Sequence, residues 1–285
     1  MNKGFTEKLI ALVEHKTGES VEVVDVNKNN GVVRKAIVVG ESGTQPVFYI
    51  EQLYEKFGND VNAAADEIAS RLNKDRVLDD YSWISNWDIA KNRIVYSLVN
   101  QEMNENDGCP KIAYLDLYIT FRVFVEDFGD GNIASVKITK ELMECWGVSP
   151  IDLMDAAQKN TEELLPSAVS PLSSVLDSMP GQEQTKELPI PIFIVTNQIK
   201  VYGAAAMMYD GILERLAYML QDDLAIIPSS VHEVLIIPKP SSPETLKDMK
   251  SWPCQVNEAV LDKEYMLSDN IYLYERETKA VKMLD

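Results

Sequence analysis

The most restrictive feature of this sequence is an unbroken alternation of apolar and other residues between positions 115 and 125. The apolar positions are Leu115, Leu117, Ile119, Phe121, Val123 and Val125. Successive side chains of a β-strand point to opposite faces of a sheet, so the pattern predicts a strand with one buried face. A turn signal, Gly129-Asp130-Gly131-Asn132, follows, and we expect residues 133 to 139 to pair with this strand as a hairpin. The chain should therefore fold around an antiparallel sheet.

The first 80 residues carry local signals for a small α+β unit. Apolar residues recur at helical spacing from Phe5 to Val13, and two β-branched runs are joined by Asn29-Asn30-Gly31, which tolerates the positive φ angles of a hairpin turn. A third strand and two helices follow. The polar stretch from Asn73 to Asp88 then indicates a boundary. We expect residues 1-80 to form a small N-terminal α+β unit and residues 81-285 a larger α+β domain, and the pattern also allows the two to pack as one.

The later part of the chain shows capping signals and a second group of strands. Thr139 and Ser149 stand where helix N-caps should stand, and Gly147 can end the first of these helices. A β-β-α-β-β unit is predicted with strands over residues 190–195, 202–208, 224–227 and 234–237, and with a helix over 212–220 behind Asp210 as its N-cap. Residues 167 to 188 are mixed and polar, and we expect a mostly exposed connection there, with one helical turn around Val175. The predicted fold class is α+β, with antiparallel sheets and packed helices.

The charge balance limits the partners that the chain can bind. Lys and Arg number 27 and Asp and Glu number 45, so the formal net charge is −18. Phosphate backbones and anionic lipid repel a chain of this sign, so we expect no direct nucleic-acid binding and no membrane binding. The three cysteines, Cys109, Cys145 and Cys254, are widely spaced, which is typical of reduced thiols. No apolar run approaches the roughly 18 residues that span a bilayer, and no signal-peptide pattern occurs near Met1, so we expect a cytoplasmic protein.

His232 is one of two histidines, and it lies beside the residue types that a hydrolase uses. The catalytic candidates are Ser229, Ser230, His232 and Glu233. They could supply a nucleophile, a base and a carboxylate, but the members of a triad converge in space and seldom adjoin in sequence. The segment from Pro228 to Glu233 is also explained as the bend between two core strands, with the serine hydroxyls satisfying turn amides and His232 bonded to backbone.

No pattern in the sequence indicates a metal or a cofactor. The segment from Glu126 to Asn132 offers carboxylates, but its glycines fall where calcium ligands should stand and no closing glutamate is correctly spaced. A P-loop, a dinucleotide-binding glycine fingerprint and a Cys/His cluster are all missing from the sequence. We therefore expect neither a metal site nor a cofactor-binding site.

Several short motifs are similar to those of one bacterial family. They are Val136-Lys137-Ile138-Thr139, Cys145-Trp146-Gly147-Val148, Ala156-Ala157-Gln158-Lys159-Asn160, Thr196-Asn197, Gly203-Ala204-Ala205, Ile227 to Val234 with Pro238, and Leu267-Ser268-Asp269-Asn270-Ile271-Tyr272. Together they resemble an uncharacterised family of Gram-positive gut bacteria, known as domain of unknown function 5688, over most of residues 90 to 275. The resemblance implies an α+β fold in a bacterial cytosol and leaves the function open.

Three functions are compatible with these observations. The leading hypothesis is a non-enzymatic cytosolic interaction or accessory protein that binds another protein, because the composition is that of an ordinary core and no convergent catalytic set is apparent. The first alternative is a hydrolase that uses His232 with Ser229 or Ser230. The second is an acidic nucleic-acid mimic, since residues 101 to 285 contain 15 basic and 30 acidic residues. The substrate, the partner and the oligomeric state stay open.

Overall fold

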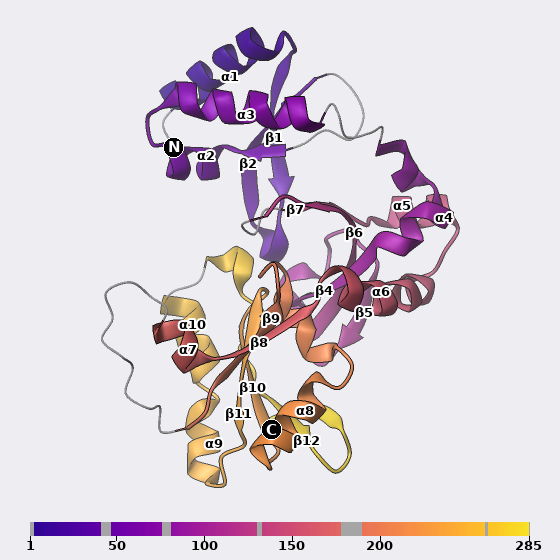
Figure 1. The fold of residues 1–285 in the computed structure, drawn as a ribbon, viewed down its shortest axis with the longest axis vertical. Helices are drawn as coiled ribbons and strands as arrows, with labels where there is room; N and C mark the ends of the chain where they lie inside the picture. Colours follow the sequence, from indigo (N-terminus) through magenta and orange to yellow (C-terminus); the bar gives the residue numbers. More distant parts are fainter. Residues whose placement is uncertain are drawn as a thin grey trace. The chain divides into compact units, whose positions relative to one another are not determined.

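The chain divides after Trp83 into two units, residues 1–83 and 84–285, which are described separately (Figure 1). The structure is a computed structural model, and it describes residues 3–40, 47–75, 81–129, 133–177, 190–259 and 262–284. The fold class is α+β with antiparallel sheets, as predicted. That residues 1-80 and 81-285 fold as separate domains stays a prediction. No helix in the described ranges is long and apolar enough to cross a membrane.

The first unit is a three-stranded antiparallel sheet with helices packed against it. Its elements are α1 (Lys3–Thr17), β1 (Val21–Asn27), η1 (Asn29–Gly31), β2 (Val33–Val39), β3 (Val47–Tyr49), α2 (Ile50–Phe57) and α3 (Val61–Asp75). The strands pair in the order β1-β2-β3, and α1 packs against α3 (Figure 1). Leu9, Ile37 and Ile68 are fully buried in one apolar core. The predicted hairpin is confirmed, because Asn30 and Gly31 adopt φ angles of 60° and 69°.

The second unit begins with a four-stranded sheet. Its elements are η2 (Tyr81–Ser85, which starts before the division), α4 (Trp87–Ala90), η3 (Lys91–Arg93), β4 (Ile94–Asn100), η4 (Glu102–Asn104), β5 (Lys111–Tyr114), β6 (Leu117–Asp127), β7 (Ile133–Lys137), α5 (Lys140–Trp146) and α6 (Pro150–Leu164). β6 is central and antiparallel to β4, β5 and β7, as its alternating pattern predicted. Both predicted caps are confirmed: Thr139 Oγ1 accepts the Leu142 N–H, and Ser149 forms a capping box with Asp152.

The ends of the alternating segment differ from the prediction. Leu115 is not in the strand but in the two-residue β5–β6 turn, where its φ is 55°. Val125 lies at a bulge, because the register of β6 and β7 shifts between Phe124 and Glu126. The alternating pattern predicts neither feature, because an apolar residue can occupy a tight turn or a bulge as well as a regular strand position.

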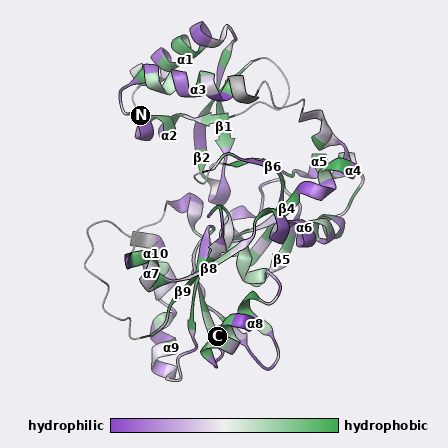
Figure 2. Cartoon of the chain, in the orientation of Figure 1, coloured by the Kyte–Doolittle hydropathy of each residue, from purple (hydrophilic) through white to green (hydrophobic). Residues whose placement is uncertain are grey.

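The rest of the second unit forms a six-stranded antiparallel sheet in the order β13-β12-β10-β11-β9-β8. Its elements are β8 (Ser167–Pro171), α7 (Leu172–Asp177), β9 (Phe193–Asn197), η5 (Gly203–Met208), α8 (Ile212–Leu220), β10 (Leu224–Ser230), β11 (Glu233–Pro238), α9 (Pro243–Met249), α10 (Trp252–Ala259), η6 (Lys263–Tyr265), β12 (Tyr272–Glu275) and β13 (Ala280–Met283). Its central strands are largely hydrophobic along their length (Figure 2). Every residue of β10 except Ser229 is buried, so both faces of this strand are covered, and α10 packs against it.

Three assignments in this region are corrected. Of the predicted β-β-α-β-β unit, the first strand, the helix and the last two strands are present as β9, α8, β10 and β11, but the second strand, predicted over residues 202–208, is replaced by η5. The small residues Gly203 to Ala206 are buried there, and a short 3₁₀ turn lets the backbone pack closely. Residues 167–171 form the edge strand β8 where an exposed connection was expected, although the helical turn predicted around Val175 is present as α7. Residues 178–188 of that connection lie outside the described part. The N-cap of α8 is Gly211 and not Asp210, whose N–H donates to Glu162.

Candidate functional site

The candidate residues 229 to 233 lie in and beside a tight hairpin turn. β10 ends at Ser230, β11 begins at Glu233, and Val231 and His232 form the two-residue connection. Ser229 is the extra residue at a bulge between Pro228 and Ser230. The structure therefore brings the four candidates together only as sequence neighbours around one turn.

The hydrogen bonds of this turn differ from those of a catalytic triad. Ser230 Oγ accepts the His232 backbone N–H at 3.0 Å, and His232 Nδ1 accepts the Tyr202 backbone N–H at 3.1 Å. In a triad, Nδ1–H donates to a carboxylate and Nε2 removes the proton of the serine. A backbone amide can only donate, so the neutral His232 ring carries its proton on Nε2. In that tautomer Nε2 cannot act as the base for a serine hydroxyl.

His232 instead belongs to a series of rings from distant parts of the chain. Its ring centroid lies 5.0 Å from that of Tyr265 and 6.0 Å from that of Tyr202. The Arg122 guanidinium carbon lies 5.0 Å from the Tyr202 ring centroid, within the range of a cation–π contact. We call Arg122, Tyr202, His232 and Tyr265 the ring series. All four are partly buried, and they come from β6, the loop before η5, the β10–β11 turn and η6.

The backbone at Gly203 packs closely against both the β10–β11 turn and β9. A Cβ atom at this position would lie 2.5 Å from the His232 carbonyl oxygen and 2.7 Å from the Asn197 nitrogen, and it would also collide with the Thr196 hydroxyl. Thr196 Oγ1 donates to the same His232 carbonyl at 2.7 Å. The Tyr202 backbone is held at a φ of 53° just before this contact. Only glycine permits so close an approach of two backbones.

Thr196 and Ser230, which bond to the backbone of His232, lie on segments that carried the family resemblance. A family model described as a family of unknown function, DUF5688, matches residues 2–276 of this chain. The chain belongs to this family. The match covers nearly all of both units, so the DUF5688 assignment applies to the whole fold described above. No curated protein and no solved structure matches the chain.

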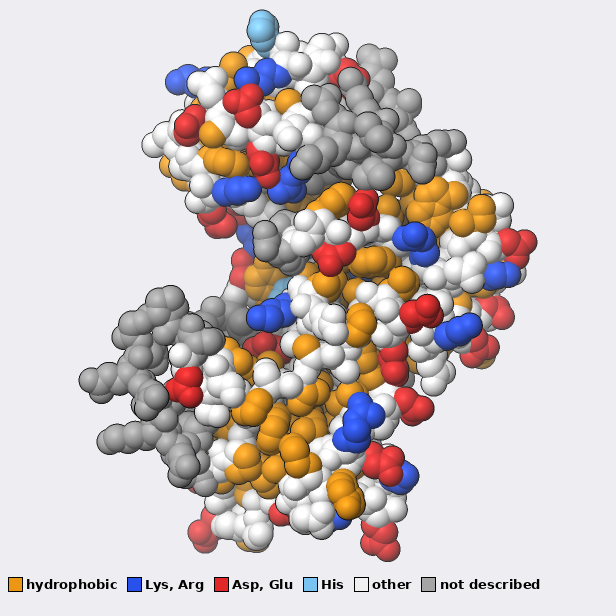
Figure 3. All heavy atoms as spheres, viewed as in Figure 1, with side chains coloured by type: hydrophobic (Ala, Val, Ile, Leu, Met, Phe, Trp, Pro, Cys, Tyr) orange, Lys and Arg blue, Asp and Glu red, His pale blue; other side chains and the backbone are white. Residues whose placement is uncertain are grey.

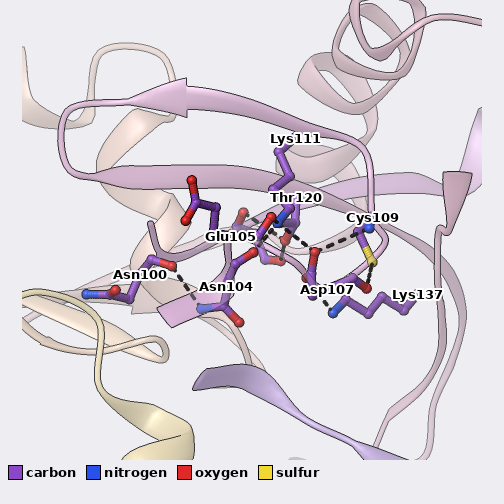
Figure 4. Close-up of polar contacts among 9 residues, drawn as sticks. Asn100, Asn104, Glu105, Asp107, Cys109, Lys111, Thr120 and Lys137 are labelled. Carbon is purple, nitrogen blue, oxygen red and sulfur yellow. Dashed lines mark hydrogen bonds and ion pairs between the residues drawn. The ribbon is translucent and has the colours of Figure 1, made fainter. Parts of the chain in front are cut away.

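A second polar cluster of this DUF5688 member is centred on Asp107 (Figure 4). The Asp107 carboxylate lies between two lysines, at 2.7 Å from Lys111 Nζ and 2.9 Å from Lys137 Nζ. Lys111 also donates to the backbone carbonyls of Asn104 and Glu105. Nothing in the sequence pattern joined these residues, because they come from a loop, β5 and β7.

The surroundings of this cluster favour the ionised form of Asp107 and the neutral thiol form of Cys109. Burial alone would raise the pKa of Asp107, but hydrogen bonds from Lys111 and Lys137 outweigh it and hold that pKa below its ordinary value. Burial raises the pKa of the neighbouring Cys109 thiol. A thiol with a raised pKa is a poor nucleophile, so Cys109 is not a catalytic candidate.

A third cluster connects the β5–β6 turn to the C-terminal segment. Asp116 accepts hydrogen bonds from Ser268 Oγ at 2.6 Å, Asn270 Nδ2 at 2.9 Å and the Tyr272 hydroxyl at 2.6 Å. Burial, and then the charge of Asp116, raises the pKa of Tyr272 well above its ordinary value. The three donors all belong to the motif Leu267 to Tyr272, so part of the family resemblance rests on residues that hold two distant segments together. Sequence reasoning found the motif but not its partner.

The described residues contain no group of three or more His, Cys, Asp or Glu side chains that could hold a metal ion. Residues 130–132, which complete the loop weighed as a calcium site, lie outside the described part.

Proposed function

We propose that this DUF5688 member is a non-enzymatic interaction or accessory protein of a bacterial cytosol. The observation that supports this most is the Tyr202 N–H donated to His232 Nδ1, which leaves the only histidine near the candidate serines in the wrong tautomer for a base. Ser230 Oγ in turn serves the turn by accepting the His232 N–H. A partner that is a protein fits a net charge of −18 better than a nucleic acid or an anionic membrane does.

The two alternatives have weaker support. A hydrolase that uses His232 with Ser229 or Ser230 would require the ring to exchange its bond with Tyr202 for a bond to a carboxylate. An acidic nucleic-acid mimic would present a row of carboxylates in place of phosphates. Acidic and basic side chains are interspersed over the face drawn in Figure 3, which does not favour a mimic.

The experiment that separates a binding protein from a hydrolase is His232→Ala. Removal of the ring leaves the partly buried Tyr202 N–H without its acceptor, so we expect the free energy of unfolding to fall by about 1 to 3 kcal/mol. A catalytic histidine more often leaves stability unchanged or raised when it is replaced. Denaturant midpoints of the wild type and the variant are measured beside turnover of ester, amide and phosphoester substrates. His15→Ala, at the exposed end of α1, is the matched control.

We expect a destabilised His232→Ala variant, an unchanged His15→Ala variant and no turnover by any of the proteins. The proposed function would be overturned, and the hydrolase established, by turnover in the wild type that is lost in His232→Ala and also in one of the two serine variants, Ser229→Ala or Ser230→Ala.

A further inference from the structure

One face of the β4–β6–β5 sheet carries three cations in neighbouring positions. Residues 117, 119, 121 and 123 of β6 are buried on the apolar face, so Thr120 and Arg122 point to the opposite face. Lys111 of β5 is paired with Thr120, and Lys137 of β7 is paired with Arg122. Residues paired directly across strands have side chains on the same face, about 5 Å apart at Cβ. We call Lys111, Arg122 and Lys137 the basic face.

The basic face has an excess of positive charge in a strongly acidic chain. Within the described ranges, the only carboxylate that bonds to any of its cations is Asp107, which is shared by Lys111 and Lys137. These three cations and the one carboxylate that bonds to them have an excess of two positive charges, in a protein whose net charge is −18. The two lysine side chains are 11% and 28% exposed, so bulk solvent screens this charge only in part.

Arg122 is the member of the basic face that has no carboxylate partner in the described structure. Its Nε donates to Ser135 Oγ at 2.9 Å, and its guanidinium carbon lies 5.0 Å from the centroid of the Tyr202 ring. Arg34 and Arg71 of the first unit, in contrast, pair with Glu51 and Glu67. A guanidinium has five N–H donors, so four of those of Arg122 remain in a fixed fork that matches a bidentate oxyanion.

The surroundings hold Arg122 in place before any ligand arrives. Tyr202, against which it lies, has a φ of 53° and donates its N–H to His232 Nδ1. The Asn197 side chain closes the preceding loop by bonding to both the N–H and the carbonyl of Val201. A binding group whose position is fixed in advance loses less entropy on binding, which favours affinity.

We propose that the basic face binds a phosphoryl group, either free phosphate or the phosphate of a small molecule. A phosphate monoester carries about −1.5 to −2 charges at pH 7 and so balances this excess of two positive charges, whereas a carboxylate supplies only one negative charge. Arg122 supplies the bidentate donors, Lys137 the second cation and Ser135 a hydroxyl. This inference deepens the proposed function and rests on it in one respect: the ligand is held and is not converted.

The test is a titration of the full-length, ¹⁵N-labelled protein with inorganic phosphate at constant ionic strength, followed at the arginine Nε–Hε resonances. We expect a saturable shift of the Arg122 resonance and no saturable shift of the resonance of the exposed Arg215. Acetate is titrated in the same way and should bind at least about tenfold more weakly, because it lacks the second charge. Phenyl phosphate, as a third probe, distinguishes an organic phosphate from the free ion by its affinity relative to inorganic phosphate.

Variants of Arg122 test whether the fork or only the charge is needed. Arg122→Gln should weaken phosphate binding by about tenfold to a hundredfold, because hydrogen bonds to charged groups contribute about 1.5 to 3 kcal/mol. Arg122→Lys keeps the charge and the aliphatic stem, and it should lie between Arg122→Gln and the wild type. Arg215→Gln should bind phosphate as the wild type does. The titration of the wild type needs no variant, so a folding defect in Arg122→Gln leaves the test intact.

The inference is overturned if phosphate gives no saturable shift at Arg122, if acetate binds as tightly as phosphate, or if a folded Arg122→Gln variant binds phosphate with wild-type affinity. These failures differ from failure of the proposed function. If the protein binds phosphate and also hydrolyses a phosphoester, the binding site is retained and the non-enzymatic function is overturned. If it does neither, the binding site is overturned and the non-enzymatic function is retained.

Discussion

The two units of this chain use their polar side chains in different ways. In the described part of residues 1–83 the ion pairs lie at the surface, except that of Arg34 with Glu51. Lys16 pairs with Asp66 and Lys35 with Asp25, and these two carboxylate side chains are 65% and 61% exposed. Exposed pairs of this kind contribute about 0 to 1 kcal/mol each. The first unit therefore depends mainly on the apolar core between its helices and its sheet.

In residues 84–285 polar side chains bond inside the fold and over long distances in sequence. The fully buried Thr161 hydroxyl accepts the Tyr96 N–H at 3.0 Å, and Asp116 binds side chains 152 to 156 residues later. A buried group that loses its partner costs about 1 to 3 kcal/mol. The second unit therefore depends on individual polar contacts in addition to its core, and three substitutions test this difference between the units.

The largest effect is expected from Gly203→Ala in the second unit. The new methyl group would collide with Thr196, Asn197 and the His232 carbonyl, so the hairpin must separate from β9. We expect the free energy of unfolding to fall by about 3 kcal/mol, at the upper end for overpacking. Denaturant unfolding is followed by tryptophan fluorescence, since Trp87, Trp146 and Trp252 all lie in the second unit.

Gly147→Ala at the end of α5 is the control for this change. Gly147 lies in the left-handed region, with a φ of 69° and a ψ of 31°, and a Cβ atom there would meet nothing within 4 Å, so only the cost of that backbone conformation, about 1 kcal/mol, is expected. Equal losses in the two variants would show that close packing at Gly203 contributes nothing special.

Asp116→Asn should have the second largest effect. Asparagine keeps one acceptor oxygen but replaces the other with an amide donor, which cannot accept from Ser268 or Asn270. We expect a loss of about 2 kcal/mol in the free energy of unfolding. The control is Asp66→Asn in the first unit, which should change stability by less than about 0.5 kcal/mol. Similar effects of the two changes would refute the contrast between the units.

The smallest effect concerns the response of the Asp107 cluster to acid. The pKa of Asp107 is lowered in the folded state, so its ion pairs stabilise the fold above the unfolded-state value of about 3.9 and are lost as the pH falls through the folded-state value. We expect the wild type to be more stable than Asp107→Asn at pH 6 by about 1 kcal/mol or less, and the difference to shrink below pH 4. Stability curves of both proteins from pH 6 to pH 2.5 provide the measurement. A difference that stays constant over this range would contradict the assignment.

Local signals in the sequence predicted much of the fold. The hairpin at Asn30 and Gly31, the caps at Thr139 and Ser149 and the central strand β6 all depend on neighbours within a few residues, and all are confirmed. The edge strand β8 and the 3₁₀ helix η5 were missed, because packing against distant elements decides their conformation. Propensity is a weak guide where tertiary contacts decide.

Sequence patterns predicted less of the candidate site than of the fold, because its contacts join residues that are far apart in sequence. The sequence drew attention to His232 and its neighbours, whereas the atoms that bond to it belong to Tyr202 and Thr196, 30 and 36 positions away. The basic face could have been found in part, because Thr120 and Arg122 occupy the non-apolar positions of the alternating strand. Thr120 pairs with Lys111 and Arg122 pairs with Lys137 because of the strand register, which turns and bulges determine. The negative net charge of the chain also gives no sign of a local basic cluster.

The bonds of Asp116 to Ser268 and Tyr272 have a consequence for how the protein is made. A ribosome that adds about 5 to 20 residues per second needs roughly 8 to 30 seconds to proceed from Asp116 to Tyr272, 156 positions later. During this time the nascent chain already contains β5, β6 and their turn, but the donors that satisfy Asp116 and the strand β12 that flanks β10 have not yet been synthesised. The second unit is therefore completed only near the end of translation, and this interval is when a chaperone would have most to protect.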